Sequence, residues 1–412
     1  MKSDLHRLMA ENELDAIWVI GPAAHNPPMV YLTGGGHITQ ADLILKRGEK
    51  GVLFHGPMER DEAARTGLIT RSYSSYPFAE FLKEANQDRF RASVLRLKRM
   101  LEDLGLTRGR VMLFGQYDAG VAFALFDALQ KELPELSILG DVENKVLQQA
   151  MLTKDREEVE RIRRVGQKTV EVIDLTADYL RSQRLKGDVL VDAQGEPITV
   201  GRVKRLINLW LAERDLENPE GTIFAIGRDA GVPHSSGKAE DVLRAGQTIV
   251  FDIFPCETGG GYFFDMTRTW CLGYAPGAVE KLYEQVLTVF HAVSSEVRVH
   301  GHFRDLQRRT CELFEGMGHP TVLTQPQTEV GYVHSLGHGV GLNIHEKPVS
   351  GLMASPEDDV LLPGSVVTIE PGLYYPDQNM GVRLENTVYL APDGKIETLA
   401  DYPLDLVLKL KG

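Results

Sequence analysis

Short apolar runs alternate with helical patterns along the first third of the chain. Four runs of strand length predict β-strands at residues 16–20, 41–46, 51–55 and 110–114. Apolar positions with a period near 3.6 predict helices over residues 78–105 and 119–134. The run MVYLTGGG at 29–36 predicts a strand that ends in a glycine turn. Strands that alternate with helices in this way predict an α/β domain over residues 1–150.

The pattern changes after a long charged helix, which is predicted over residues 153–183. From residue 221 onward, apolar runs are separated by glycine and proline turns and predict many strands. These runs are GTIFAIG, QTIVFDIF, YFFDMTRTWCLG, SVVTIEPGLYY and MGVRLENTVYLA. Helical patterns at 278–298 and 303–317 lie between them. The chain is long for a single domain, so we expect a second, α+β domain over residues 151–412.

Composition narrows the possible partners. The chain has 45 Lys and Arg against 58 Asp and Glu, a net charge of −13. This charge argues against nucleic acid as a partner, because phosphate binding needs clustered cations. The N-terminus lacks the apolar core of a signal peptide, and no apolar run approaches the length of a membrane span. Three cysteines without CxxC spacing suit a reducing compartment. We therefore expect a cytoplasmic protein with no membrane partner.

Two aspartates interrupt apolar runs on what the pattern predicts to be a β-hairpin. Asp252 lies in VFDIFP and Asp265 in FFDMTRT, on either side of a glycine-rich turn. An acidic side chain in such a run is costly unless it is paired. A hairpin can bring both carboxylates within reach of one cation. The alternative is that both aspartates lie on the solvent face, and the flanking TIVF and YFF argue against it.

Three histidines fall within the glycine-rich segment HSLGHGVGLNIHE, namely His334, His338 and His345. The first two are spaced i, i+4, which on a helix would suggest a zinc site of the HExxH kind. The surrounding glycines disfavour a helix, and the glutamate of that motif is missing. A lone histidine is more often a hydrogen-bonded core residue than a ligand. Here three histidines lie close together, and the glycines between them allow the backbone to approach a ligand. This combination favours a binding site.

Two glutamates complete the set. Glu370 precedes a Pro-Gly pair at a strand end, and Glu385 lies on VRLEN with Arg383 on the same face. Considered by itself, Glu370 could be a surface glutamate at the end of a strand. Glu385 could likewise form a cross-strand ion pair. Four carboxylates and one imidazole at one spot would repel one another unless cations held them. Oxygen-rich ligation with one nitrogen suits two divalent ions of the manganese kind, with zinc and cobalt as alternatives.

The ordered motifs resemble those of the pita-bread metallopeptidases, which include methionine aminopeptidase, Xaa-Pro aminopeptidase and prolidase. The resemblance covers residues 150–412 through motifs and the remainder through general layout. It implies that Asp252 binds one ion, that His338 and Glu370 bind the other, and that Asp265 and Glu385 bridge both. Glu370 would also take a proton from the water. The spacing of the two aspartates is slightly longer than is usual in the family.

The resemblance also implies roles for five residues around the ions. His234, in GRDAGVPHSSG, matches a family histidine beside the scissile carbonyl. His345 would contact the substrate, and His334 would lie in or next to the substrate pocket. Tyr374 and Arg383 match residues near the first aspartate and the substrate in Xaa-Pro aminopeptidases.

Four functions are compatible with this resemblance to different degrees. The N-terminal domain favours an Xaa-Pro aminopeptidase over methionine aminopeptidase. Such an enzyme releases the N-terminal residue from a peptide with proline second. The resemblance also implies a homodimer. A prolidase that cleaves only Xaa-Pro dipeptides shares every motif. A non-catalytic pita-bread protein or a metal-free creatinase-like hydrolase would lack ligands that are all present here.

Overall fold

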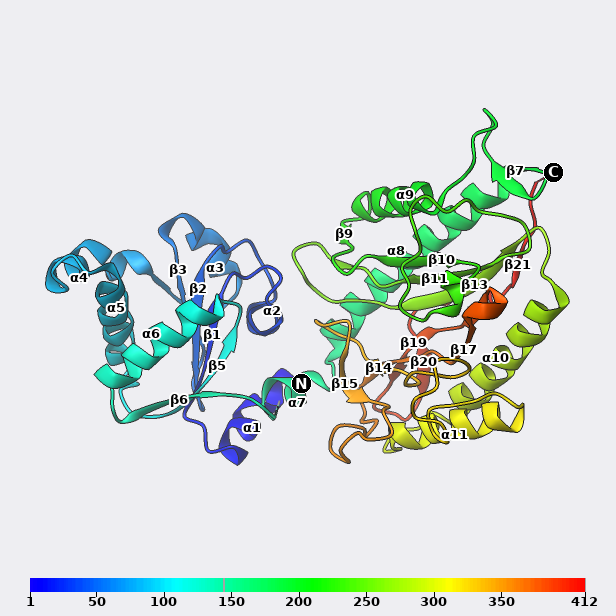
Figure 1. Ribbon diagram of the computed structural model, residues 1–412. Coiled ribbons are helices and arrows are strands. Elements are labelled where there is room, and N and C mark those ends of the chain that lie inside the picture. Colours follow the sequence, from blue (N-terminus) through cyan, green and yellow to red (C-terminus); the bar gives the residue numbers. More distant parts are fainter. Residues whose placement is uncertain (144, 412) are drawn as a thin grey trace. The chain divides into compact units, whose positions relative to one another are not determined.

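The computed structural model describes residues 1–143 and 145–411 of the chain. It divides the chain into two compact units, each with its own sheet and apolar core (Figure 1). The first unit consists of Met1–Met151 with Gly259–Gly261, and the second of Leu152–Thr258 with Tyr262–Gly412.

A six-stranded mixed sheet forms the centre of the first unit. Its strand order is β4-β3-β2-β1-β5-β6. The strands are β1 (Ala16–Gly21), β2 (Ala41–Lys46), β3 (Val52–His55), β4 (Ile69–Ser72), β5 (Gly109–Gly115) and β6 (Leu136–Gly140). β1 pairs antiparallel with β2 and parallel with β5, and all six of its residues are buried. A continuous apolar run is what a central strand covered on both faces requires.

Seven helices accompany this sheet among the described residues. They are α1 (Leu5–Glu11), α2 (Pro27–Thr33), α3 (Arg60–Arg65), α4 (Phe78–Glu84), α5 (Arg89–Asp103), α6 (Ala119–Glu132) and α7 (Leu147–Met151). The predicted strand at 29–36 is wrong, because this run forms α2. Pro27 and Pro28 occupy the first helical positions, and left-handed Gly34 ends the helix. The single helix predicted over 78–105 is also interrupted, since Asn86 and Gln87 adopt positive φ.

Two larger sheets form the second unit. The four-stranded sheet has the order β10-β11-β13-β21, and the five-stranded sheet has the order β15-β14-β16-β19-β20. The first contains β10 (Thr222–Ile226), β11 (Thr248–Ile253), β13 (Met266–Leu272) and β21 (Val407–Leu408). The second contains β14 (His338–Gly339), β15 (Glu346–Val349), β16 (Val366–Ile369), β19 (Asn386–Leu390) and β20 (Ile396–Thr398). Three two-stranded pairs join β7 (Arg184–Lys186) to β8 (Val189–Val191), β9 (Leu216–Glu217) to β12 (Cys256–Glu257), and β17 (Gly372–Tyr375) to β18 (Met380–Arg383).

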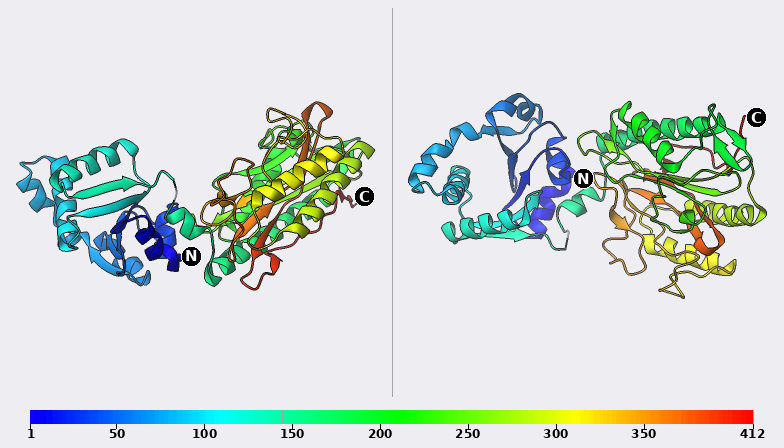
Figure 2. Two further views of the ribbon diagram at one scale, coloured as in Figure 1. Left: turned by 90° about the horizontal axis from the view of Figure 1, so that it is seen from below. Right: turned by 45° about the horizontal axis from the view of Figure 1, so that its top comes forward.

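Four helices of the second unit are α8 (Arg156–Arg181), α9 (Val200–Ala212), α10 (Gly277–Glu296) and α11 (Phe303–Gly316). α10 and α11 lie side by side (Figure 2). Their apolar faces pack against residues of β16, β17 and β18 in one core. The predicted helices at 153–183, 278–298 and 303–317 are confirmed within a few residues, whereas α9 had not been predicted. No helix in the described part of the chain is long and apolar enough to cross a membrane.

Candidate metal centre and active site

Two neighbouring strands of the four-stranded sheet bring Asp252 and Asp265 together. β11 and β13 pair antiparallel, and Asp252 lies opposite Thr267. Asp265 is two residues before Thr267, so it points to the same face and lies diagonally across from Asp252. The connection between the strands is not a simple hairpin turn, because it contains β12, which pairs with β9. The predicted pairing of the two strands is confirmed, and both carboxylates line the same cavity.

The five-stranded sheet positions His338 and Glu370. His338 lies on β14, and Glu370 follows β16, which pairs with β14. The Thr368 side chain links them: it accepts the His338 N–H at 3.1 Å and donates to Glu370 Oε1 at 3.4 Å. His338 Nε2 lies 3.4 Å from Glu370 Oε1 and 3.7 Å from Asp265 Oδ2. One imidazole nitrogen therefore faces carboxylates that come from both sheets.

Glu385 closes the cluster from the segment between β18 and β19. Its Oε2 accepts a hydrogen bond from the Thr267 hydroxyl at 2.7 Å. Asp265, His338 and Glu385 each offer one ligand atom, and these atoms all lie within 4.8 Å of one another. The structure thus gathers all five residues that the sequence singled out as ligands.

Close backbone packing explains the glycines around His338. A Cβ atom at Gly337 would lie 2.1 Å from the Thr368 carbonyl oxygen, and one at Gly339 would lie 2.1 Å from the Lys347 carbonyl oxygen. The glycines were expected to let backbone approach a ligand. They instead let β14 approach its own neighbours, which places the His338 side chain at the carboxylates.

The donor set fits divalent metal ions. Asp265 is 4% and Glu385 1% exposed, and three carboxylate oxygens, Asp252 Oδ1, Asp265 Oδ1 and Glu385 Oε1, are buried without a hydrogen-bond partner among the described residues. Burial lowers the pKa of His338 to about 3, so its ring is neutral at neutral pH. With Nδ1 3.1 Å from the Gly339 carbonyl oxygen, the proton lies on Nδ1, and Nε2 turns a lone pair toward the carboxylates. Such an arrangement is repulsive unless a cation lies between these atoms.

Without metal, the cluster should make stability fall as pH rises. Burial, followed by the charge of Asp252, raises the pKa of Glu385 from 4.5 to about 8, and burial also raises the pKa of Asp265 and Glu370. The protonated carboxyls are favoured in the folded state, so their contribution is complete below about pH 4.5 and is lost as the pH rises through about 8.

We expect the Tm gap between metal-loaded and chelator-treated protein to widen from pH 5 to pH 8, corresponding to on the order of a few kcal/mol. Differential scanning calorimetry measures this gap. The Glu385→Gln variant should show a smaller pH dependence in its metal-free form. A gap that stays constant or narrows over this range would contradict the burial of charged carboxylates here.

A hydrogen-bonded chain runs from Asp252 to His334. Arg383 Nη2 donates to Asp252 Oδ2 at 2.7 Å, and Arg383 Nη1 donates to the Tyr374 hydroxyl at 2.8 Å. His334 Nδ1 lies 2.7 Å from the Ser335 carbonyl oxygen, which places the proton of this neutral ring on Nδ1. The Tyr374 hydroxyl therefore donates to His334 Nε2, at 2.8 Å. This chain fixes the orientation of the Asp252 carboxylate and the tautomer of His334.

A cavity of about 750 Å³ opens onto the cluster. Asp252, Asp265, His338 and Glu370 line it together with His234, His334, His345 and Arg383. His234 and His345 are exposed on its wall, and the His345 ring centroid lies 4.3 Å from that of His338. Glu385 and Tyr374 are more deeply buried. All ten predicted site residues thus belong to the cavity wall or to its immediate support.

Several supporting residues were not identified from the sequence. Thr267 and Thr368 orient the ligands, and buried Arg268 donates to the Glu385 carbonyl oxygen at 2.7 Å. Lys154 and Glu346 form a fully buried ion pair, with Glu346 next to His345. The alternation that placed Asp265 and Thr267 on one face was a usable signal for Thr267. The partner of Lys154 lies 192 positions away, and no local pattern could indicate it.

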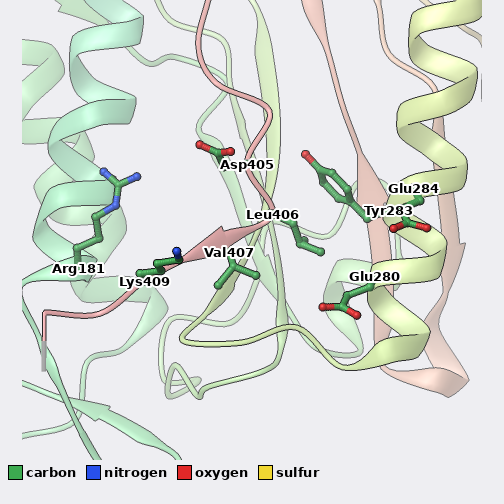
Figure 3. Close-up of a pocket in the computed structure, with 8 residues that line it drawn as sticks. All are labelled: Arg181, Glu280, Tyr283, Glu284, Asp405, Leu406, Val407 and Lys409. Atoms are coloured by element: carbon green, nitrogen blue, oxygen red, sulfur yellow. The ribbon is translucent and has the colours of Figure 1, made fainter.

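A second cavity of about 690 Å³ lies elsewhere in the same unit (Figure 3). Acidic side chains from α10 and from the C-terminal segment line it together with the cations Arg181 and Lys409. None of the ten candidate residues is among the described residues that line it. Its mixed charges do not indicate a particular ligand.

Comparison with known proteins identifies the family. The family model of Metallopeptidase family M24 matches residues 160–392, which is more than half of the 412-residue chain. The chain belongs to metallopeptidase family M24. This M24 metallopeptidase is 32% identical over 188 residues to the putative dipeptidase YkvY of Bacillus subtilis, a match that covers 45% of the chain and 47% of that relative. The chain thus matches about half the length of YkvY.

Two further matches extend over nearly the whole M24 chain. The Xaa-Pro dipeptidase of Pyrococcus furiosus is 24% identical over 399 residues, which cover 96% of this chain and 97% of the relative. The crystal structure of X-Pro aminopeptidase from Thermotoga maritima superposes with a TM-score of 0.74 at 20% identity, covering 97% of this chain and 99% of that chain. These findings confirm the predicted family and the predicted fold, an α/β unit followed by an α+β pita-bread unit.

Proposed function

We propose that this chain is a dinuclear metallopeptidase that releases the N-terminal residue from peptides with proline in second position. The observation that carries the proposal is the convergence of three carboxylates and one neutral imidazole on one cavity wall, with the carboxylate of Glu385 buried beside them. Five such donors are enough for two ions that share bridging carboxylates. We propose manganese as the metal, with zinc and cobalt as alternatives.

Each ligand has a proposed place. Asp252 would bind one ion, His338 and Glu370 would bind the other, and Asp265 and Glu385 would bridge both. When bound, the ions supply Lewis acidity, which activates water and polarises the scissile carbonyl. Glu370 would accept the proton of the attacking water, and the position of its carboxylate on the cavity wall beside His338 supports this role.

The remaining site residues would position the reacting groups. Arg383 and Tyr374 would hold Asp252 in one orientation, and His334 would anchor the Tyr374 hydroxyl. His234 and His345 are exposed to the cavity, so they are the histidines that can donate hydrogen bonds to a bound peptide. We propose that His234 contacts the scissile carbonyl and that His345 contacts the residues beyond it.

Proline specificity is supported by the relatives that match over nearly the full length. They are named Xaa-Pro dipeptidase and X-Pro aminopeptidase, and the matches include the N-terminal region. We propose residues 1–150 as an N-terminal domain and 151–412 as the catalytic domain, in a cytoplasmic homodimer. Three buried, free cysteines are compatible with a reducing compartment. A prolidase restricted to Xaa-Pro dipeptides is the alternative function, since the same residues would serve it.

The test compares four peptide classes on one metal-loaded sample. Chelator-stripped, refilled protein should saturate near two ions per chain by metal analysis. At this loading, we expect cleavage of Xaa-Pro-Xaa and little cleavage of Xaa-Ala-Xaa or Met-Ala-Xaa. Cleavage is measured by release of the free N-terminal amino acid, and Xaa-Pro dipeptides form the fourth class.

The outcomes separate the candidate functions. Equal cleavage of proline and alanine peptides would remove the proline assignment, and cleavage of Xaa-Pro dipeptides alone would select prolidase. Saturation at one ion or none would remove the dinuclear site. A protein that binds its ions but cleaves none of the four classes would be a non-catalytic member of the family.

A further inference from the structure

Lys204 lies on the cavity wall outside the ligand cluster. It belongs to α9, and its Nζ donates to the Ser236 carbonyl oxygen at 3.0 Å. Ser236 follows His234 by two residues and also accepts a hydrogen bond from Phe224 N on β10. The ammonium group is thus held at the edge of β10, beside the segment that carries His234.

Within the described part of the chain, the Lys204 ammonium group bonds to a backbone carbonyl and to no carboxylate. Of the described residues that line the cavity, Lys204 and Arg383 carry permanent positive charge. The Arg383 guanidinium is committed to Asp252 and Tyr374. The partner described for the Lys204 ammonium is a neutral backbone carbonyl, so two of its three donors remain for other groups. The Lys204 side chain is half-buried, and this burial lowers its pKa.

The position of Lys204 suits a short peptide bound at the cluster. β10 is the edge strand of its sheet, and Ile223 on β10 lies opposite Asp252. Neighbouring strands lie about 4.8 Å apart, and an extended residue spans about 3.3–3.6 Å. A peptide of two or three residues is therefore long enough to reach from the carboxylate cluster to the edge of β10.

We propose that Lys204 binds a carboxylate of the substrate and makes this peptidase selective for peptides that place a negative charge near the scissile bond. The proposal rests on the proposed function, because it assumes that the peptide is cleaved at the cluster. The carboxylate can come from the C-terminus of a dipeptide or tripeptide, or from the side chain of an N-terminal Asp or Glu. Glu220 also lines the cavity and is exposed to solvent.

The experiment uses matched charged and neutral peptides. One pair is Ala-Pro-Ala with a free or an amidated C-terminus, and the other is Glu-Pro-Ala-amide with Gln-Pro-Ala-amide. We expect Lys204→Met to lower kcat/KM about tenfold for the charged peptide of at least one pair, mainly through KM, and to leave its neutral partner unchanged. Lys204→Arg should restore most of this preference. Lys168→Met is the control, because Lys168 makes the same kind of bond, to the Arg214 carbonyl oxygen at 2.6 Å.

Binding provides a readout that does not depend on turnover. Calorimetric titration with the reduced-amide analogue of Ala-Pro-Ala, as free acid and as amide, should show the same selective loss in Lys204→Met if the C-terminus is the source. A loss in the first peptide pair alone identifies the C-terminus, and a loss in the second alone identifies the side chain; either supports the proposal. Equal losses for charged and neutral peptides would overturn it and leave Lys204 as a support for the His234 segment. Wild-type protein without any charge preference would also overturn it.

The proline specificity of the proposed function can be wrong while the proposal for Lys204 is right. If wild-type protein cleaves Xaa-Ala bonds instead of Xaa-Pro bonds, the same pairs are synthesised with alanine in second position. The charge preference is then read on the bond that is cleaved.

Discussion

Replacing Glu370 by glutamine is expected to lower kcat by about 10²–10⁴-fold, the usual cost of losing a general base. The amide keeps the shape of the side chain and can still accept the hydrogen bond from Thr368, so the fold should persist. What it loses is the basic carboxylate oxygen beside His338 Nε2. Steady-state kinetics on an Xaa-Pro-Xaa peptide, at measured metal content, gives the effect.

Two controls separate the loss of a base from the loss of a ligand. Glu397→Gln changes an exposed glutamate on β20 of the same sheet and should leave kcat unchanged. Metal analysis of Glu370→Gln shows whether both ions are still bound. A variant with full metal content and nearly wild-type kcat would show that another group accepts the proton.

Much of the candidate site could be predicted because its residues stand out locally. Asp252 and Asp265 interrupt apolar runs, and burying a carboxylate in such a run requires a compensating partner. The glycines around His338 disfavoured a helix, and the segment indeed forms none: His338 lies on the two-residue strand β14, flanked by bends. Local sequence is sufficient for these residues because strand alternation and glycine content already decide their conformation.

Two helices were missed although local signals for them were present, and a contact between distant residues could not be predicted from local sequence. The run at 29–36 has the composition of a strand, but the proline pair before it and the glycines after it place a helix there. α9, which carries Lys204, was also not predicted, although the Thr199 side chain caps its N-terminus by accepting a hydrogen bond from the Arg202 N–H. The bond of Thr267 to Glu385 joins residues 118 positions apart, and only the assembled sheets bring them together.

The ion pair between Arg383 and Asp252 should dominate the stability of the metal-free cluster. Both residues are buried, with Arg383 only 3% exposed, and their closest atoms lie 2.7 Å apart. Removing one partner of such a pair leaves a buried charge without compensation, at a cost of about 3–5 kcal/mol. We therefore expect Arg383→Met to lower the Tm of chelator-treated protein by roughly 6–20 °C.

The design of this test isolates the charge from the shape of the side chain. Adding Asp252→Asn to Arg383→Met removes the second charge, so the double variant should recover a substantial part of the lost stability. Arg244→Met breaks the exposed pair with Asp188 and should leave Tm nearly unchanged. If the double variant is as unstable as Arg383→Met alone, the loss of Tm comes from packing or from the hydrogen bond to Tyr374. Recovery would instead show that Arg383 is the built-in cation of a site whose other carboxylates need metal ions, because a single guanidinium cannot compensate four of them.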